Sequence, residues 1–368
     1  MRLALAAALV AACGLFTASA QDDSPRAAKL KTIQKTYNDE FDAFLKKLQG
    51  VKTREERSGV ISEGKENAAL TGEKLAKLVE ENPKDAVALD AAVYGIMKMA
   101  QFGAAGPNLD KMLAAVSDHH INNAKVGELV MVAPQMGDAG EKLLKAAAEK
   151  STDKSIKGRA LYFLGSALAE QADGAPNEKA AAELTAKAID YLEKAAKDAG
   201  EVRVGPSTIA KMAEDDLTAL KTLGVGKTAP DVTGVGLKDE KTKLSSLKGK
   251  VVLLDIWATW CPPCRAMIPH ERELVTRMKG KAFELVSVSA DDKKETLEEF
   301  LKETPMPWTH WWAGRDSDIL KTFRVRAFPT LYLIDARGVI RKKWIGSPDN
   351  AVLDREIEAL VAEAGRTN

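Results

Sequence analysis

The chain has 368 residues, of which 54 are Lys or Arg and 53 are Asp or Glu, and 45% are apolar. At roughly 100–200 residues per domain, this length predicts two domains with enough apolar material for buried cores. Because the charges balance and no basic run occurs, the composition gives no support for binding to nucleic acid or to an acidic membrane.

The first twenty residues have the pattern of a secretory signal peptide. Arg2 is followed by the short apolar stretch 3–16, and Ala18-Ser19-Ala20 matches the small-residue cleavage pattern. The stretch is shorter than the roughly 20 apolar residues of a membrane-spanning helix. We therefore expect an exported protein, periplasmic or otherwise extracytoplasmic, that is cleaved after Ala20.

A lipid anchor is the alternative interpretation of this segment. Val10-Ala11-Ala12-Cys13 is similar to a bacterial lipoprotein cleavage box, which would leave Cys13 as a lipidated N-terminus. The apolar run, however, continues past Cys13 to Phe16, and few residues precede the box. We favour simple cleavage.

Residues 21–224 predict an all-helical domain. The segment is rich in Ala, Lys, Glu and Leu at helical spacing, and Pro and Gly interrupt it at intervals that suit antiparallel helices. Expected helix starts near Asp85, Asp118 and Asp153 lie 33 and 35 residues apart, close to the period of about 34 found in helical-hairpin repeats. The full repeat pattern is missing. A non-repeating helical bundle and helical-hairpin repeats therefore both stay open, and we favour the bundle.

Residues 225–368 predict an α/β domain that begins after the Gly-containing boundary 224–227. The run 251–257 is continuously apolar, as in a strand buried on both faces. Strands that alternate with helices indicate a sheet with an antiparallel hairpin near its end. The expected strands cover 251–257, 283–289, 330–334 and 339–345, and the expected helices cover 263–279, 293–303 and 349–364.

The cysteines point to chemistry rather than to structural cross-linking. The chain has three, and if Cys13 leaves with the signal, only Cys261 and Cys264 remain, spaced C-x-x-C. Exported proteins often use disulfides as staples. A loop between residues three apart, however, is too short for its closure to stabilise the fold much. We therefore predict a redox-active pair.

The pair stands where the buried strand leads into a helix. A thiolate at a helix N-terminus lies beside unpaired N–H groups and the positive end of the helix dipole, which lowers its pKa below the free value of about 8.5. Pro262 fits the first helical position. We expect Cys261 to be the exposed attacking thiol and Cys264, one turn deeper, to be the resolving thiol that releases a mixed disulfide.

Other uses of a C-x-x-C motif do not fit the neighbouring residues. Haem attachment needs His after the second cysteine, where Arg265 stands, and structural zinc needs four ligands, of which only His270 is near. A peroxiredoxin-like peroxidase needs Thr or Ser three residues before its cysteine and Pro four further back. Those positions hold Ala258 and Leu254. We expect no metal and no organic cofactor.

Several motifs occur in order along residues 226–346. They are Ala229-Pro230-Asp231, Leu247-Lys248-Gly249-Lys250, the run W-A-T-W-C-P-P-C-R at 257–265, Phe328-Pro329-Thr330, and Leu333-Ile334-Asp335 with Gly338. This region resembles the TlpA/ResA-like branch of the thioredoxin superfamily, the extracytoplasmic disulfide reductases. The resemblance implies a thioredoxin-like fold, protein disulfide reductase activity, and an active site shaped by Trp260, Pro262 and Pro263. The helical domain has no counterpart in the minimal family domain.

The resemblance also implies that Pro329 is a cis-proline facing the cysteine pair, since a cis X-Pro bond is typical of a tight turn. The preceding residue, Phe328, would then present its backbone to a client peptide, which adds to it as a strand. A smaller or β-branched residue is more usual there, so an altered groove is one interpretation. Simple core packing of Phe328 is the other.

The family often has Glu three residues after the second cysteine, where this chain has Met267. Asp255, six residues before Cys261, occupies the place where thioredoxin keeps a buried Asp. A buried carboxyl beside the dithiol would have a raised pKa and could take the proton from Cys264. Asp255 is the only carboxyl that the sequence places near that sulfur. The alternative is an Asp that only caps or pairs.

The expected partners follow from the resemblance. They are disulfide-bearing exported proteins, with apocytochrome c cysteines among the candidate clients, and a membrane thiol donor. The helical domain adds a candidate surface for a protein partner. The alternative function is a helical scaffold or binding protein whose thioredoxin-like domain senses redox state instead of turning over.

Overall fold

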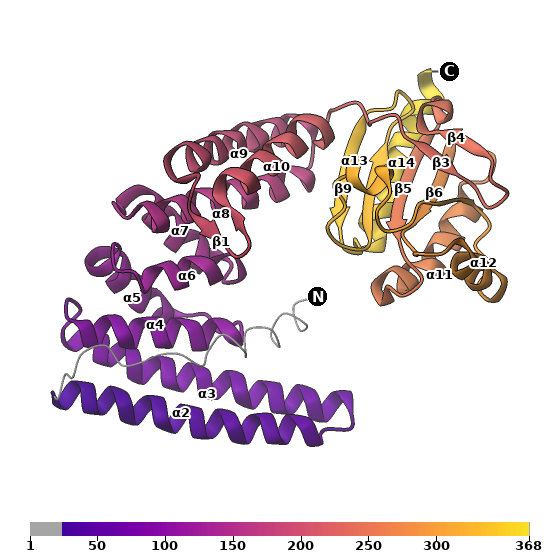
Figure 1. Cartoon of the computed structure of the whole chain (residues 1–368). Coiled ribbons are helices and arrows are strands. Elements are labelled where there is room, and N and C mark those ends of the chain that lie inside the picture. Colours follow the sequence, from indigo (N-terminus) through magenta and orange to yellow (C-terminus); the bar gives the residue numbers. More distant parts are fainter. Residues whose placement is uncertain (1–23, 368) are drawn as a thin grey trace. The chain divides into compact units, whose positions relative to one another are not determined.

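The computed structural model describes residues 24–367, so the predicted cleavage after Ala20 and lipidation of Cys13 concern residues outside this range. The chain forms two compact units (Figure 1). One comprises the described residues up to Leu164 together with Glu193–Ala213, and the other comprises Gly165–Leu192 and the chain from Glu214 onward. Within 24–367, none of the helices is long and apolar enough to cross a membrane.

The predicted helical fold of the first half is confirmed, and Figure 1 shows α2 to α7 following one another side by side. α8, α9 and α10 each contribute to both units. The helices are α2 (Pro25–Gly50), α3 (Arg54–Glu81), α4 (Ala86–Gln101), α5 (Pro107–Ala115), α6 (Val126–Val132), α7 (Asp138–Lys150), α8 (Lys154–Asp173), α9 (Glu178–Ala199) and α10 (Ile209–Leu223), with a hairpin of β1 (Arg203–Val204) and β2 (Ser207–Thr208).

Two of the three predicted helix starts are confirmed. Asp85 caps α4, since its side chain accepts a hydrogen bond from the N–H of Ala88. Asp153 accepts from two N–H groups at the start of α8. The start predicted near Asp118 is wrong. That residue lies in a π-helical turn, Val116–His120, that continues α5 without the extended residue that an N-cap needs.

The second half contains a seven-stranded sheet, in agreement with the predicted α/β class. Its order is β4-β3-β7-β6-β5-β8-β9, with β5 parallel to β6 and antiparallel to β8. The strands are β3 (Thr233–Val235), β4 (Lys241–Lys243), β5 (Val251–Trp257), β6 (Phe283–Ser289), β7 (Thr309–Trp312), β8 (Thr330–Ile334) and β9 (Ile340–Ile345), and the helices are α11 (Pro262–Arg277), α12 (Lys294–Glu303), α13 (Asp318–Thr322) and α14 (Asn350–Thr367).

The two faces of the sheet carry separate cores. Because side chains alternate along a strand, Leu254 of β5 packs with residues of α12 and α13 on one face, such as Leu297. Leu253 packs on the other face with residues of α11 and α14, such as Leu274 and Leu353. The position of Asp255 in this alternation places its side chain on the face covered by α11.

Residues 165–192 belong with the sheet rather than with the preceding helices. They pack on β9, which is an edge strand. Lys343 forms an ion pair with Asp173 at 3.0 Å, and the ammonium of Lys342 donates to the carbonyl of Ala175. Covering an edge strand protects it from pairing with another chain. The second unit therefore includes a helical segment that lies before the expected boundary at 224–227.

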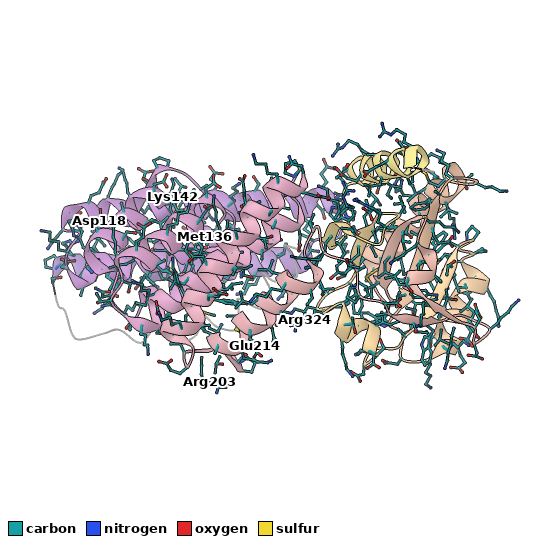
Figure 2. All side chains as sticks on the ribbon, turned by 90° about the horizontal axis from the view of Figure 1, so that it is seen from above. Asp118, Met136, Lys142, Arg203, Glu214 and Arg324 are labelled. Atoms are coloured by element: carbon teal, nitrogen blue, oxygen red, sulfur yellow. A yellow bond between two sulfur atoms is a disulfide. The ribbon has the colours of Figure 1, made fainter. Side chains whose placement is uncertain are left out.

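Helix α10, which precedes the sheet in the chain, also contacts the segment that follows α13. Arg324, labelled in Figure 2, follows α13, and its guanidinium donates to the backbone carbonyl of Asp215 at 2.7 Å. Arg326 forms an ion pair with Asp216 at 3.0 Å. These two contacts join the C-terminal part of α10 to the domain that contains the sheet.

Candidate active site

Cys261 and Cys264 lie at the start of α11, where the sequence places them. Cys261 is the N-cap residue and Pro262 is the first helical residue. The two cysteines form a disulfide, and the N–H of Cys264 donates to the sulfur of Cys261 at 3.3 Å. This N–H belongs to the unpaired group at a helix N-terminus, so the site offers Cys261 a donor that favours its thiolate.

The predicted exposure of Cys261 is wrong for the disulfide form. Cys261 and Cys264 are each 4% exposed, and both pack in the core cluster that includes Ile268. Pro262 and Pro263, which lie between the cysteines, are exposed. Position at the helix cap, and not accessibility, therefore distinguishes the two cysteines.

The loop before Cys261 is held by Asp291, which the sequence reading missed. Asp291 is buried and follows β6. Its carboxylate accepts hydrogen bonds from the N–H and the hydroxyl of Thr259, at 3.2 and 2.7 Å, and from the hydroxyl of Ser289 at 2.7 Å. A polar residue directly after a buried strand was the available signal. This network fixes the segment that leads into the disulfide.

The peptide bond between Phe328 and Pro329 is cis, as the resemblance implied. The N–H of Gly346 donates to the carbonyl of Pro329 at 2.8 Å, and the hydroxyl of Ser347 donates to the carbonyl of Pro263 at 3.3 Å. Gly346 and Ser347, which follow β9, thus connect the cis-proline with Pro263, which lies between the two cysteines.

Phe328 has the core packing that was one of the two interpretations of its position. It packs against the core cluster that contains the disulfide. Its ring also meets the ring of Trp260 edge to face, with centroids 5.4 Å apart. Trp260 is 49% exposed and directly precedes Cys261. An aromatic pair with one exposed ring therefore lies next to the redox pair.

Asp255 lies in the buried strand β5, as predicted, and is 4% exposed. The hydroxyl of Ser287 donates to one carboxylate oxygen at 3.3 Å, and Trp308 in turn donates to Ser287 at 2.8 Å. Its other oxygen has no hydrogen-bond partner among the described residues. Burial raises the pKa of Asp255 to about 7, and the bond from Ser287 opposes that rise.

Glu271 of α11, which the sequence analysis did not single out, is also buried, with 1% exposed. Burial, and then the charge of Asp255, raise the pKa of Glu271 well above its usual range. The signal was present in the helical stripe formed by Met267, Glu271 and Leu274. A charged residue on that stripe would ordinarily be assigned to a solvated face.

Comparison with known proteins agrees with this geometry. Residues 225–343 match the AhpC/TSA family. A thiol-disulfide oxidoreductase ResA of Bacillus cereus is 31% identical over 136 residues, which is 37% of this chain and 78% of that protein. ResA of Geobacillus kaustophilus is 29% identical over 143 residues, or 39% of this chain and 82% of that protein.

Among solved structures, a putative thiol:disulfide interchange protein DsbE from Chlorobium tepidum shares 32% identity, over 38% of this chain and 99% of that one, with a TM-score of 0.36. Sequence similarity to ResA thus covers most of the relative, and it coincides with the thioredoxin-like sheet and its cysteine pair. The chain belongs to the ResA family of thiol–disulfide oxidoreductases, and its thioredoxin-like domain has that activity.

Proposed function

We propose that the protein is exported and reduces disulfides in extracytoplasmic proteins through Cys261 and Cys264. The observation that carries the proposal is the cysteine pair at the N-cap of α11, next to a cis-proline and an accessible aromatic pair. The signal-peptide pattern of residues 1–20 supports export. The resemblance to extracytoplasmic reductases supports the reducing direction and a membrane thiol donor.

In the first step, the Cys261 thiolate attacks one sulfur of the client disulfide. A bond forms between Cys261 and that sulfur, and the other client sulfur leaves as a thiolate, which takes a proton from water. The helix N-terminus favours the attacking thiolate through its N–H groups and dipole. Pro262 and Pro263 are exposed, and the attack requires that the sulfur of Cys261, which is buried in the disulfide, becomes accessible once the pair is reduced.

In the second step, Cys264 resolves the mixed disulfide. Its thiol gives a proton to the carboxylate of Asp255, and the resulting thiolate attacks the sulfur of Cys261. The Cys261–Cys264 disulfide forms and the client leaves as a thiolate, which is then protonated. The client has gained two electrons and the cysteine pair has lost two. A dithiol donor must therefore reduce the pair again before the next cycle.

The client binds as an extended peptide in this proposal. The backbone at Phe328 offers hydrogen bonds to an added strand, and the rings of Trp260 and Phe328 form an apolar wall for the residues that flank the client cysteine. Phe328 packs on the core and also contacts Trp260, so the core of the domain supports this apolar surface.

Steady-state turnover tests the proposal against a sensing role. The full chain is supplied with an excess of a small dithiol donor and a disulfide-bonded protein substrate. An oxidoreductase reduces many equivalents of substrate per molecule, and a variant with both cysteines replaced by Ser reduces none. A single equivalent reduced, followed by arrest while the donor remains, would identify a redox sensor instead.

A further inference from the structure

The face of the sheet that contains Asp255 carries a row of buried polar side chains. In the strand register, Asp255 of β5 lies beside Ser287 of β6, and Ser287 lies beside His310 of β7. Residues paired in this way point to the same face. All three are buried, with 7% or less of each exposed. Burying several polar side chains in an apolar core costs free energy of folding unless these side chains bond to one another.

Glu271 comes to the same face from the helix above. On α11 it stands between Met267 and Leu274, four residues after one and three before the other, so the three share one stripe. Met267 and Leu274 pack in the same core cluster as Leu253, the neighbour of Asp255 on this face. The charge of Asp255, after burial, helps to raise the pKa of Glu271. The two carboxyls are therefore both buried between this face of the sheet and α11.

Both carboxyls have an oxygen that is buried and has no hydrogen-bond partner within residues 24–367. Two adjacent negative charges in an apolar core are far more costly than one, because each loses its hydration and repels the other. With one proton between them, the pair carries a single charge. The structure thus favours a state in which one carboxyl is ionised and the other is neutral.

We propose that Asp255 and Glu271 act as one acid–base unit with a single negative charge, which makes Glu271 a positioning residue for proton transfer at Cys264. The inference rests on the proposed role of Asp255. Glu271 is seven residues from Cys264, about 10 Å along the helix axis, so it acts through Asp255 and not on the sulfur itself. Its neutral form leaves the carboxylate of Asp255 as the acceptor.

The other ionisable groups around the pair have partners of their own. His310 bonds to the carbonyl of Met306 at 2.9 Å, and burial lowers its pKa, which keeps it neutral. On the side of α14, Asp354 pairs with His270 at 2.9 Å and with Arg277 at 2.6 Å. On β9, Lys342 donates to the carbonyl of Ala175 and lies 3.9 Å from Glu356.

The pair should therefore titrate in two separated steps. Asp255 gives up its proton first, and its charge then holds the proton on Glu271 to higher pH. Between the two steps the pair always contains one proton acceptor and one proton.

Carbon-13 NMR titration of the side-chain carboxyls in the oxidised full chain tests the coupling. The wild type should show two buried carboxyls that ionise in separate steps. In Asp255→Asn, the pKa of Glu271 should fall by about one unit or more, because the neighbouring charge is gone. Glu271→Gln should leave the single ionisation of Asp255. The matched control is Glu273→Gln, an exposed residue of the same helix, which should change neither.

The pH profile of the resolving step links this coupling to the reaction. Glu271→Gln should remove the upper ionisation from the profile, whereas Glu273→Gln should keep it. An unchanged Glu271 pKa in Asp255→Asn would overturn the pair, even where that variant resolves slowly as the proposed function requires. Normal resolution in Asp255→Asn with a shifted Glu271 pKa would instead refute the proposed role of Asp255 at Cys264, and with it the positioning role of Glu271. Should Glu271→Gln fail to fold, the Glu271 titration in Asp255→Asn decides alone.

Discussion

Cys261 and Cys264 are equally buried in the disulfide, so their different roles must come from their places on α11. Cys261 caps the helix, and Cys264 lies one turn inside it. We predict that Cys264→Ser accumulates mixed disulfides with client proteins through Cys261, because the attack proceeds and the resolution cannot. Gel analysis of the trapped complexes measures this. Cys261→Ser is the matched control, and equal trapping by that variant would reverse the assignment.

Burial of Asp255 makes stability depend on pH. Its pKa is about 7 in the folded chain, above the ordinary value of 3.8. The folded state therefore binds this proton more tightly than the unfolded state, and the contribution of this group to the free energy of unfolding falls as pH rises from about 4 to 7. Well below pH 3.8 the group is protonated in both states and no penalty remains.

Asp255→Asn should remove that penalty. We predict that its free energy of unfolding exceeds that of the wild type by on the order of 4 kcal/mol at pH 8 and by little at pH 4. Denaturation curves at the two pH values test this. The same variant should slow the resolving step while attack by Cys261 is retained. Lost stability together with unchanged resolution would show that Asp255 is only a structural hydrogen-bonding residue.

At the scale of the elements, the loop between β5 and α11 depends on Asp291. Asp291→Ala leaves the donors of Thr259 and Ser289 buried without their acceptor. We predict a loss of about 2–4 kcal/mol in the free energy of unfolding, measured by chemical denaturation. Asp292→Ala is the control, since Asp292 is exposed. Equal stability of the two variants would mean that the loop is held by other contacts.

The long elements of this domain were predictable, and the short ones were not. β5, β6 and β8 occupy the predicted residues, because continuous apolar runs identify buried strands. The expected strand 339–345 was one residue too long at its start. β3, β4 and β7 have three or four residues, too few to show a period, and their polar residues resemble a loop.

The candidate site follows the same division. Local motifs placed Cys261, Asp255 and the cis-proline, since each depends on residues adjacent in the chain. Glu271 and Asp291 act through contacts between elements that are distant in sequence, which periodicity does not register. The packing of residues 165–192 on β9 likewise depends on individual ion pairs, such as that of Lys343 with Asp173.

At the scale of the whole molecule, the sheet and its helices should fold without the first unit. We predict that a fragment of residues 225–368 folds cooperatively and reduces a generic disulfide substrate, because it contains all seven strands of the sheet. A fragment that begins at residue 165 should be more soluble, since it keeps the cover of β9. Calorimetry and turnover compare the two. An inert 225–368 fragment beside an active full chain would make the helical segments part of the catalytic fold.

The redox potential of the Cys261–Cys264 pair tests the central claim most directly. The full chain is equilibrated in glutathione buffers of graded potential, and the fraction of reduced cysteines is measured by thiol alkylation, with Cys261→Ser as the control that shows no two-electron transition. A reductant of client disulfides should have a value near that of thioredoxin, about −270 mV. A value near about −120 mV would contradict this reducing role, because such a pair donates its disulfide to clients and oxidises them.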